Sequence, residues 1–154
     1  MSAVPSAAGA LAATPRAVEQ ARPWRHSPPR ISVVIATFRR PDLLRRCMIA
    51  VLEQSIDADA FELLVVDDGH SDETRAVVES LAPPGGAPAV RYLRPKKGRG
   101  PAVARNCGWR AAYGSVIAFT DDDTIPERDW LASGERALVP ELTAVAGRIR
   151  VPPV

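Results

Sequence analysis

The chain has 154 residues, a length typical of a single domain. Its hydrophobic content of 46% and charged content of 25% are ordinary for a globular protein. Lys and Arg number 20 and Asp and Glu number 18, so the formal charge is only +2 and gives no reason to expect nucleic-acid binding. No stretch approaches the roughly 18 consecutive apolar residues of a membrane span.

The first thirty residues read as a disordered tail. Residues 1–30 are rich in Ala, Pro and Ser and show no sustained hydrophobic period. A basic start followed by an unbroken apolar core is missing, so the segment does not resemble a secretory signal. Basic residues surround Trp24 and could touch an anionic surface, but a solvated lead-in is the more typical reading.

The two cysteines, Cys47 and Cys107, lie far apart and match no metal-ligand spacing. We therefore expect free thiols, which fit a reducing cytoplasm. The sequence leaves open an association with the inner face of the membrane.

The body of the chain alternates between strand and helix patterns. β-Branched runs of strand length predict strands, and apolar residues at helical spacing predict helices. Pro41 suits the first turn of a helix, Ser71 or Asp72 is the expected N-cap of another, and Gly114 is expected to stop a third. In chain order the predictions are strand 31–36, a helix from Pro41 with apolar positions through Leu52, strand 61–66, helix 73–81, strand 90–93, helix 101–112, strand 115–120, helix 130–138 and strand 144–151.

This order predicts an α/β fold in which βαβ units build an open, mainly parallel sheet with helices on both faces. Crossovers in such a sheet are right-handed. The apolar run that contains Ile117 and Phe119 predicts a strand buried on both faces.

Polar clusters follow the predicted strands at 37–40, 67–69 and 121–123, and a basic, glycine-containing turn at 96–100 opens a helix. In open α/β sheets, ligands bind beyond the carboxyl ends of the strands. Free N–H groups at a helix start favour phosphate. One rim would thus carry both carboxylates and cations, a combination that suits a metal–diphosphate ligand.

The three consecutive aspartates are the centre of this hypothesis. Adjacent carboxylates repel one another. We therefore expect three of them in a row only where a cation or hydrogen-bond donors stabilise their charge. Oxygen ligands suit Mg²⁺ or Mn²⁺, which keeps waters and bridges to substrate phosphates. In an extended chain Asp121 and Asp123 would share one face and Asp122 the other. The alternative is a solvated acidic turn that caps the helix near Asp129.

Taken singly, the other clusters have ordinary readings. Asp67-Asp68-Gly69 alone is typical of a turn, and Lys96 and Lys97 of a solvated loop. Phe38 alone is more typical of a core residue than of a stacking platform. The joint order of the clusters is the specific signal.

Four motifs carry a resemblance to a known family: ISVVIATFRRPDLL at 31–44, LVVDDG at 64–69, GPAVARNCG at 100–108 and FTDDD at 119–123. Over about residues 31–151 the chain resembles glycosyltransferase family 2, which has the GT-A fold. The first loop of that family commonly has Asn where this chain has Arg39, so the resemblance implies no role for that side chain. The turn after the carboxylate pair commonly reads Gly-Ser, where this chain has Gly-His-Ser at 69–71.

The resemblance implies a nucleotide-sugar site with a divalent cation, Mg²⁺ or Mn²⁺. Phe38 would lie against the base, and Asp68 or its neighbour Asp67 would accept a hydrogen bond from it. Asp123 would be the main metal ligand of a DxD-type motif, with Asp121 as the second. The implied nucleotide-sugar-binding residues are Ala36, Thr37, Phe38, Arg40, Asp67, Asp68, Arg105, Asp121 and Asp122.

The implied activity is inverting, metal-dependent transfer of a sugar from a nucleotide-diphosphate donor, most commonly a UDP-sugar, to a hydroxyl of a glycan, lipid or small molecule. The family's acceptor half and its general base are expected beyond Val154, so the chain is expected to be the donor-binding half. The alternative is a truncated, non-catalytic nucleotide-binding fragment. A nucleotidyltransferase is a more distant reading, because its glycine-rich first loop is not found at 37–41.

Overall fold

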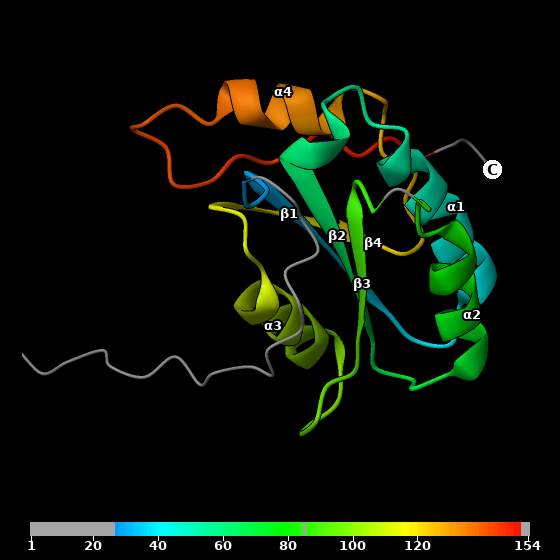
Figure 1. Cartoon of the computed structure of the whole chain (residues 1–154). Helices are drawn as coiled ribbons and strands as arrows, with labels where there is room; N and C mark the ends of the chain where they lie inside the picture. The colour runs from blue at the N-terminus through cyan, green and yellow to red at the C-terminus, as the bar shows by residue number, and fades with distance from the viewer. Residues whose placement is uncertain (1–26, 85, 152–154) are drawn as a thin grey trace, which may run out of the picture.

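The computed structural model describes residues 27–84 and 86–151, which form a sheet with helices packed on it (Figure 1). The elements in chain order are β1 (Ile31–Thr37), α1 (Pro41–Leu52), the 3₁₀ turn η1 (Ala58–Ala60), β2 (Phe61–Asp67), α2 (Asp72–Leu81), β3 (Ala89–Leu93), α3 (Pro101–Ala111), β4 (Val116–Asp121) and α4 (Trp130–Ala137). Pro41 stands in the first turn of α1, and Ser71 caps α2 by accepting a hydrogen bond from the Thr74 N–H, as predicted.

The four strands form one all-parallel sheet in the order β3-β2-β1-β4. β1 lies between β2 and β4: Ala36 is in register with Val66 on one side and with Asp121 on the other. The predicted parallel pairing of the three longest strands is confirmed. Its consequence is that the carboxyl ends of all four strands meet at one edge of the sheet.

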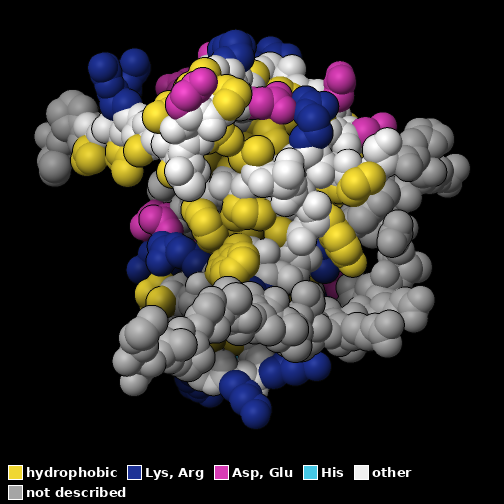
Figure 2. Space-filling view, turned by 90° about the vertical axis from the view of Figure 1, so that its left-hand side faces the viewer, with side chains coloured by type: hydrophobic (Ala, Val, Ile, Leu, Met, Phe, Trp, Pro, Cys, Tyr) yellow, Lys and Arg dark blue, Asp and Glu magenta, His cyan; other side chains and the backbone are white. Residues whose placement is uncertain are grey.

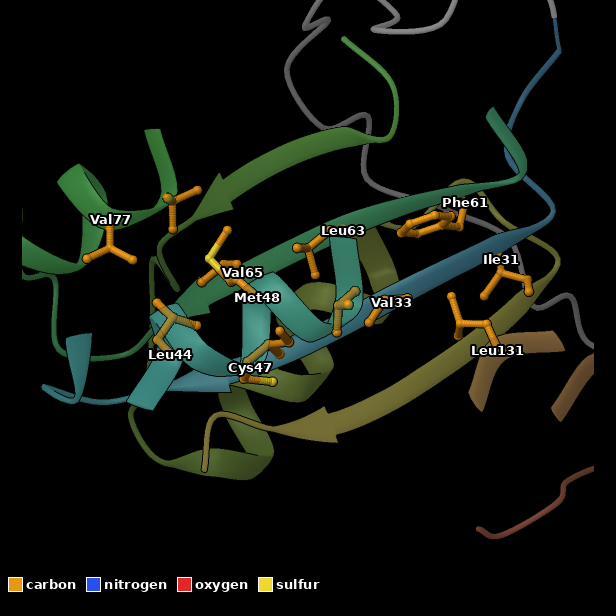
Figure 3. Close-up of a cluster of buried hydrophobic side chains, with 13 residues drawn as sticks. Ile31, Val33, Leu44, Cys47, Met48, Phe61, Leu63, Val65, Val77 and Leu131 are labelled. Carbon is orange, nitrogen blue, oxygen red and sulfur yellow. The ribbon is translucent and has the colours of Figure 1, made fainter. Parts of the chain in front are cut away.

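Helices cover both faces of this sheet, as predicted. α1 and α2 cover the face toward which Val33, Leu63 and Val65 point, and their own apolar sides supply Leu44, Met48 and Val77 to that core (Figure 3). α3 covers the opposite face, where Val34, Leu64 and Val66 meet Ala104. The alternation of apolar side chains along β1 and β2 thus fills two cores at once.

Two glycines let α3 and the chain after it approach the sheet. A Cβ on Gly108 would collide with Val34, and one on Gly114 would lie 2.6 Å from the backbone nitrogen of Ser32. The prediction that Gly114 stops the helix is wrong. α3 ends at Ala111, and Gly114 is required instead by its contact with the backbone of β1.

Two predictions about strands are also wrong. β4 is an edge strand of the described sheet rather than a strand buried on both faces, and Phe119 is 46% exposed. Residues 144–151 form no strand, because in the described structure no neighbouring strand offers them backbone partners, and their side chains are exposed. β-Branched residues favour strands only where a partner edge exists.

The predicted tail, residues 1–30, falls largely outside the described residues, which begin at 27. Pro29 is buried, and Arg30 donates its N–H to the Ala60 carbonyl and forms an ion pair with Glu135 of α4. In the described part of the chain, no helix is both long and apolar enough to cross a membrane.

Candidate functional site

The four predicted polar clusters lie along the edge where the parallel strands end. In the order of the sheet they are the basic turn after β3, the carboxylate pair after β2, the loop 37–40 after β1 and the acidic turn after β4. This edge is where open α/β sheets bind ligands. We refer to it as the rim.

Asp67 shapes the turn after β2. Its side chain is buried and accepts hydrogen bonds from the Gly69 N–H at 2.8 Å, the Ser71 N–H at 2.7 Å and the Tyr92 hydroxyl at 2.6 Å. Burial, together with this bond to Asp67, raises the pKa of the Tyr92 hydroxyl. Both oxygens of Asp67 are therefore occupied within the protein.

Asp68 differs from its neighbour because one of its oxygens has no partner. Oδ2 accepts a 2.8 Å hydrogen bond from the Gly100 N–H, at a glycine whose φ of +105° a side chain would rarely allow. Oδ1 is buried and makes no hydrogen bond in the described structure. A buried acceptor without a partner is costly, so a ligand N–H that reached this oxygen would be bound favourably.

The loop after β1 separates a buried residue from an exposed aromatic ring. Thr37 is buried, whereas Phe38 is 49% exposed, so the reading of Phe38 as a core residue is wrong. The Arg39 guanidinium lies over the Phe38 ring, 5.3 Å from its centroid. An exposed ring on the rim is a surface on which a base could stack.

The acidic turn gives each aspartate a different environment. Asp121 is paired with Arg105 of α3, and Asp123 lies 3.3 Å from Arg40. Asp122 is buried and accepts a 2.7 Å hydrogen bond from the Thr37 hydroxyl, with Arg40 at 3.5 Å. The side chain of Asp122 is buried whereas those of Asp121 and Asp123 are exposed, as alternation predicts. The two flanking carboxylates nevertheless pair with different arginines.

The acidic turn can supply only part of the ligand shell of a divalent cation, so the remaining ligands must come from a bound molecule or from water. In the described residues, no three His, Cys, Asp or Glu side chains converge as a ready cage. The side chains of Asp121 and Asp123 are 56% and 52% exposed, and each uses one oxygen in its ion pair. One or two exposed carboxylates suit Mg²⁺ or Mn²⁺ that completes its shell with phosphate and water.

The basic turn and the acidic turn follow the two edge strands of the described sheet. Lys96, Lys97 and Arg99 come after β3, whereas the acidic turn comes after β4. Gly100 ties the basic turn to Asp68. The cations beside the aspartates are Arg40 and Arg105. The sequence did not reveal these ion pairs, because no spacing relates the loop after β1, helix α3 and the turn at the end of β4.

A shallow hollow lined mainly by apolar side chains adjoins Asp121 through Arg105. It lies between α3 and the edge strand β4, and Trp109 and Phe119 there are 45% and 46% exposed; the lining residues are Ala102, Arg105, Asn106, Trp109, Ile117 and Phe119. Exposed apolar side chains gather on the face of the molecule that Figure 2 presents. The expectation of a fully buried strand hid this feature from sequence reasoning.

Known proteins resemble this chain in sequence and in fold. Glycosyltransferase AglE of Haloferax volcanii is 29% identical over 106 residues, which are 69% of this chain and 34% of that protein. The mannosyltransferase PcManGT of Pyrobaculum calidifontis, solved with GDP-Man and Mn2+, superposes with a TM-score of 0.62 at 29% identity, covering 71% of this chain and 32% of that one. S. aureus TarS 1-349, solved with UDP-GlcNAc, has a TM-score of 0.62 at 22% identity, covering 70% of this chain and 30% of that one, and shares the fold.

The chain spans about a third of the length of these relatives. The family described as glycosyl transferase family 2 matches residues 32–152, which include all four strands except the first residue of β1, and all four clusters of the rim. The chain therefore belongs to glycosyl transferase family 2.

Proposed function

We propose that the rim binds a nucleoside-diphosphate sugar and that the chain is the donor-binding half of a metal-dependent, inverting glycosyltransferase. The observation that carries the proposal is Asp68 Oδ1, a buried acceptor with no partner, on the same rim as an exposed aromatic ring and an acidic turn. A nucleotide-sugar offers a counterpart to each of these: a base N–H, a flat ring and a diphosphate.

At the base end, Phe38 provides a stacking surface and Asp68 accepts a hydrogen bond from the base. Ala36 and Thr37 line the part of the pocket that receives the base and the ribose. Asp67 was an alternative acceptor, but its oxygens already accept three hydrogen bonds from within the protein, which favours Asp68. Our preferred base is uracil, whose imino N–H donates to Asp68; thymine and guanine also carry one imino N–H, so the diphosphates of all three belong in the test.

At the phosphate end, Asp123 and Asp121 would hold Mg²⁺ or Mn²⁺, and Arg105 and Arg40 lie beside these two carboxylates. The cation, when bound, neutralises charge on the departing diphosphate. The Pyrobaculum mannosyltransferase, whose structure contains GDP-Man and Mn2+, supports this choice by likeness. Asp122 stays with Thr37 and fixes the shape of the turn near the ribose and phosphates.

In an inverting transfer, the acceptor oxygen attacks the anomeric carbon from the face opposite the diphosphate. The bond between that carbon and the phosphate oxygen breaks with its electron pair, and a general base takes the hydroxyl proton. We assign the base to none of the described residues. The proposed acceptor is a hydroxyl of a glycan, a lipid or a small molecule. We place the reaction in the cytoplasm or at the cytoplasmic face of the cell membrane.

The alternative is nucleotide binding without turnover. A radiolabelled-sugar transfer assay, run on the chain with a panel of acceptors, separates the two: binding with no product supports the alternative.

The donor proposal is tested by calorimetric titration of UDP, GDP and TDP, each with MnCl₂ and with chelator. We expect at least one diphosphate to bind, and to bind more tightly with manganese. Failure of all three to bind in manganese would overturn the proposal.

A further inference from the structure

We propose that Arg39 is a phosphate-binding residue of the donor site, held ready by a left-handed backbone and by its stacking on Phe38. The inference rests on the proposed function and adds a residue to it. Arg39 stands at the position where glycosyl transferase family 2 commonly has Asn.

The backbone at Arg39 is unusual. Its φ is +53°, in the left-handed region where a long side chain is disfavoured and where Asn or Gly is preferred. In the described chain, His70 is the other non-glycine residue with positive φ, also at +53°. Such conformations concentrate at functional sites. An arginine at a position suited to Asn indicates that its side chain makes a contact of value there.

The neighbouring turn holds the loop in place. A Cβ built on Gly69 would lie 3.1 Å from Arg39 Cγ and 3.3 Å from Arg39 N, so the turn after β2 packs directly on the Arg39 backbone and stem. The guanidinium then lies over Phe38, 5.3 Å from the ring centroid. Phe38 is still 49% exposed with the guanidinium in place, so the ring keeps open surface for a base.

The charge of Arg39 is not neutralised by the protein. Arg40 and Arg105 each pair with aspartates of the acidic turn, and Arg94 pairs with Asp72. Within residues 27–84 and 86–151 Arg39 has no carboxylate partner, and its guanidinium lies over the Phe38 ring. Of the arginines in the loop after β1, Arg39 is thus the one whose guanidinium remains for an anionic ligand.

Its position along the rim matches the course of a diphosphate. β1 lies between β2, which is followed directly by the proposed base acceptor Asp68, and β4, which leads into the acidic turn. A nucleotide that spans from one to the other must cross the loop after β1, where Arg39 stands. A planar guanidinium can donate two parallel hydrogen bonds to a phosphate.

The test uses three variants of the full chain. R39N removes the charge and suits the left-handed backbone, R39Q removes the charge and keeps the strain, and H70N relieves the same strain in the turn after β2 while leaving Arg39 in place. Each is titrated by calorimetry with UDP, GDP and TDP and with the matching nucleosides, in MnCl₂ at low and high salt. Thermal unfolding of each variant reports folding and strain.

We expect both R39N and R39Q to lose roughly tenfold to a hundredfold in diphosphate affinity, as for a lost charged hydrogen bond. Nucleoside affinity should change little, and the salt dependence of diphosphate binding should become shallower. H70N should bind like the wild type, while R39N and H70N, but not R39Q, should unfold at a higher temperature.

Wild-type diphosphate affinity in R39N and R39Q would overturn the inference while leaving the donor proposal intact. Equal losses for nucleoside and diphosphate would also overturn it, because they would place Arg39 at the base. If the wild-type chain binds none of the three diphosphates, the proposed function fails and the inference falls with it.

Discussion

Thr37 donates a 2.7 Å hydrogen bond to Asp122, a residue 85 positions later in the chain. Both side chains are buried, and the bond joins the end of β1 to the end of β4. It turns the middle aspartate of the acidic turn into the protein and leaves the two flanking carboxylates at the surface. The middle residue is thus a structural anchor, and the outer two are the candidates for ligand binding.

Asp122→Ala should therefore destabilise the fold by about 1–3 kcal/mol, because it leaves the buried Thr37 hydroxyl without its acceptor. Asp123→Ala is the matched control, since that side chain is half-exposed and its ion pair with Arg40 contributes little. Urea unfolding of the two variants measures the difference. Equal unfolding free energies would contradict the anchoring role.

Asp68→Asn should weaken nucleotide binding by about 1–3 kcal/mol, through loss of a charged hydrogen bond to the base. Asp72→Asn serves as the control, because its side chain is 98% exposed and lies at the start of α2. The measurement is calorimetric affinity for the preferred diphosphate. Unchanged affinity in a folded Asp68→Asn protein would remove Asp68 from the site.

Two helical glycines should respond oppositely to alanine. A Cβ on Gly134 in α4 meets nothing within 4 Å, so Gly134→Ala should stabilise the protein by about 0.5–1 kcal/mol through helix propensity. A Cβ on Gly108 in α3 would collide with Val34, so the same change there should destabilise by about 1–3 kcal/mol. Thermal unfolding of both variants measures the two effects. Stabilisation by Gly108→Ala would mean that α3 packs less closely against β1 than the structure shows.

Stability should fall at alkaline pH because of Cys47. Burial raises the pKa of this thiol from 9.0 to about 11. Well below pH 9 the thiol is protonated in both the folded and the unfolded chain, and its full contribution to the free energy of unfolding is present. At higher pH the unfolded chain loses the thiol proton first, so the free energy of unfolding declines as the pH rises through 11. The loss is on the order of 2 kcal/mol.

Urea unfolding at a series of pH values from about 7 to 11 checks this. The Cys47→Ala variant should be less stable at neutral pH, because a buried side chain is lost, but its stability should fall less steeply with pH. A slope in the variant as steep as in the wild type would show that another group, such as Tyr92, is responsible.

The sequence was sufficient to predict the fold's main elements, because the two periodicities are strong in this chain. The β-branched run of β1 and the apolar spacing of α1 gave the strand and helix, and Pro41 and Ser71 marked helix starts correctly. The errors came where local pattern lacks tertiary information. Residues 144–151 have strand composition without a partner strand, and Phe119 has core composition on an edge strand.

For the site, the sequence could predict that polar clusters share the rim, because parallel strands end on one side. It could not predict which groups meet there. The ion pairs of Arg40 and Arg105 with the acidic turn join the loop after β1 and helix α3 to the end of β4, and the Gly100 N–H that holds Asp68 comes from the N-cap of α3. The distinction between Asp67 and Asp68 likewise depends on Tyr92, whose strand lies on the far side of β2.

The central claim, that the acidic turn and a divalent cation together hold the donor's diphosphate, is tested most directly by one titration. The affinity of the preferred nucleoside diphosphate is measured with MnCl₂ and with chelator, for the wild type and for Asp123→Ala. We expect manganese to tighten binding to the wild type and to have no effect on the variant, whose thermal unfolding should stay close to that of the wild type. If Asp123→Ala keeps the full gain from manganese, the acidic turn is only a surface turn and the proposed metal role is wrong.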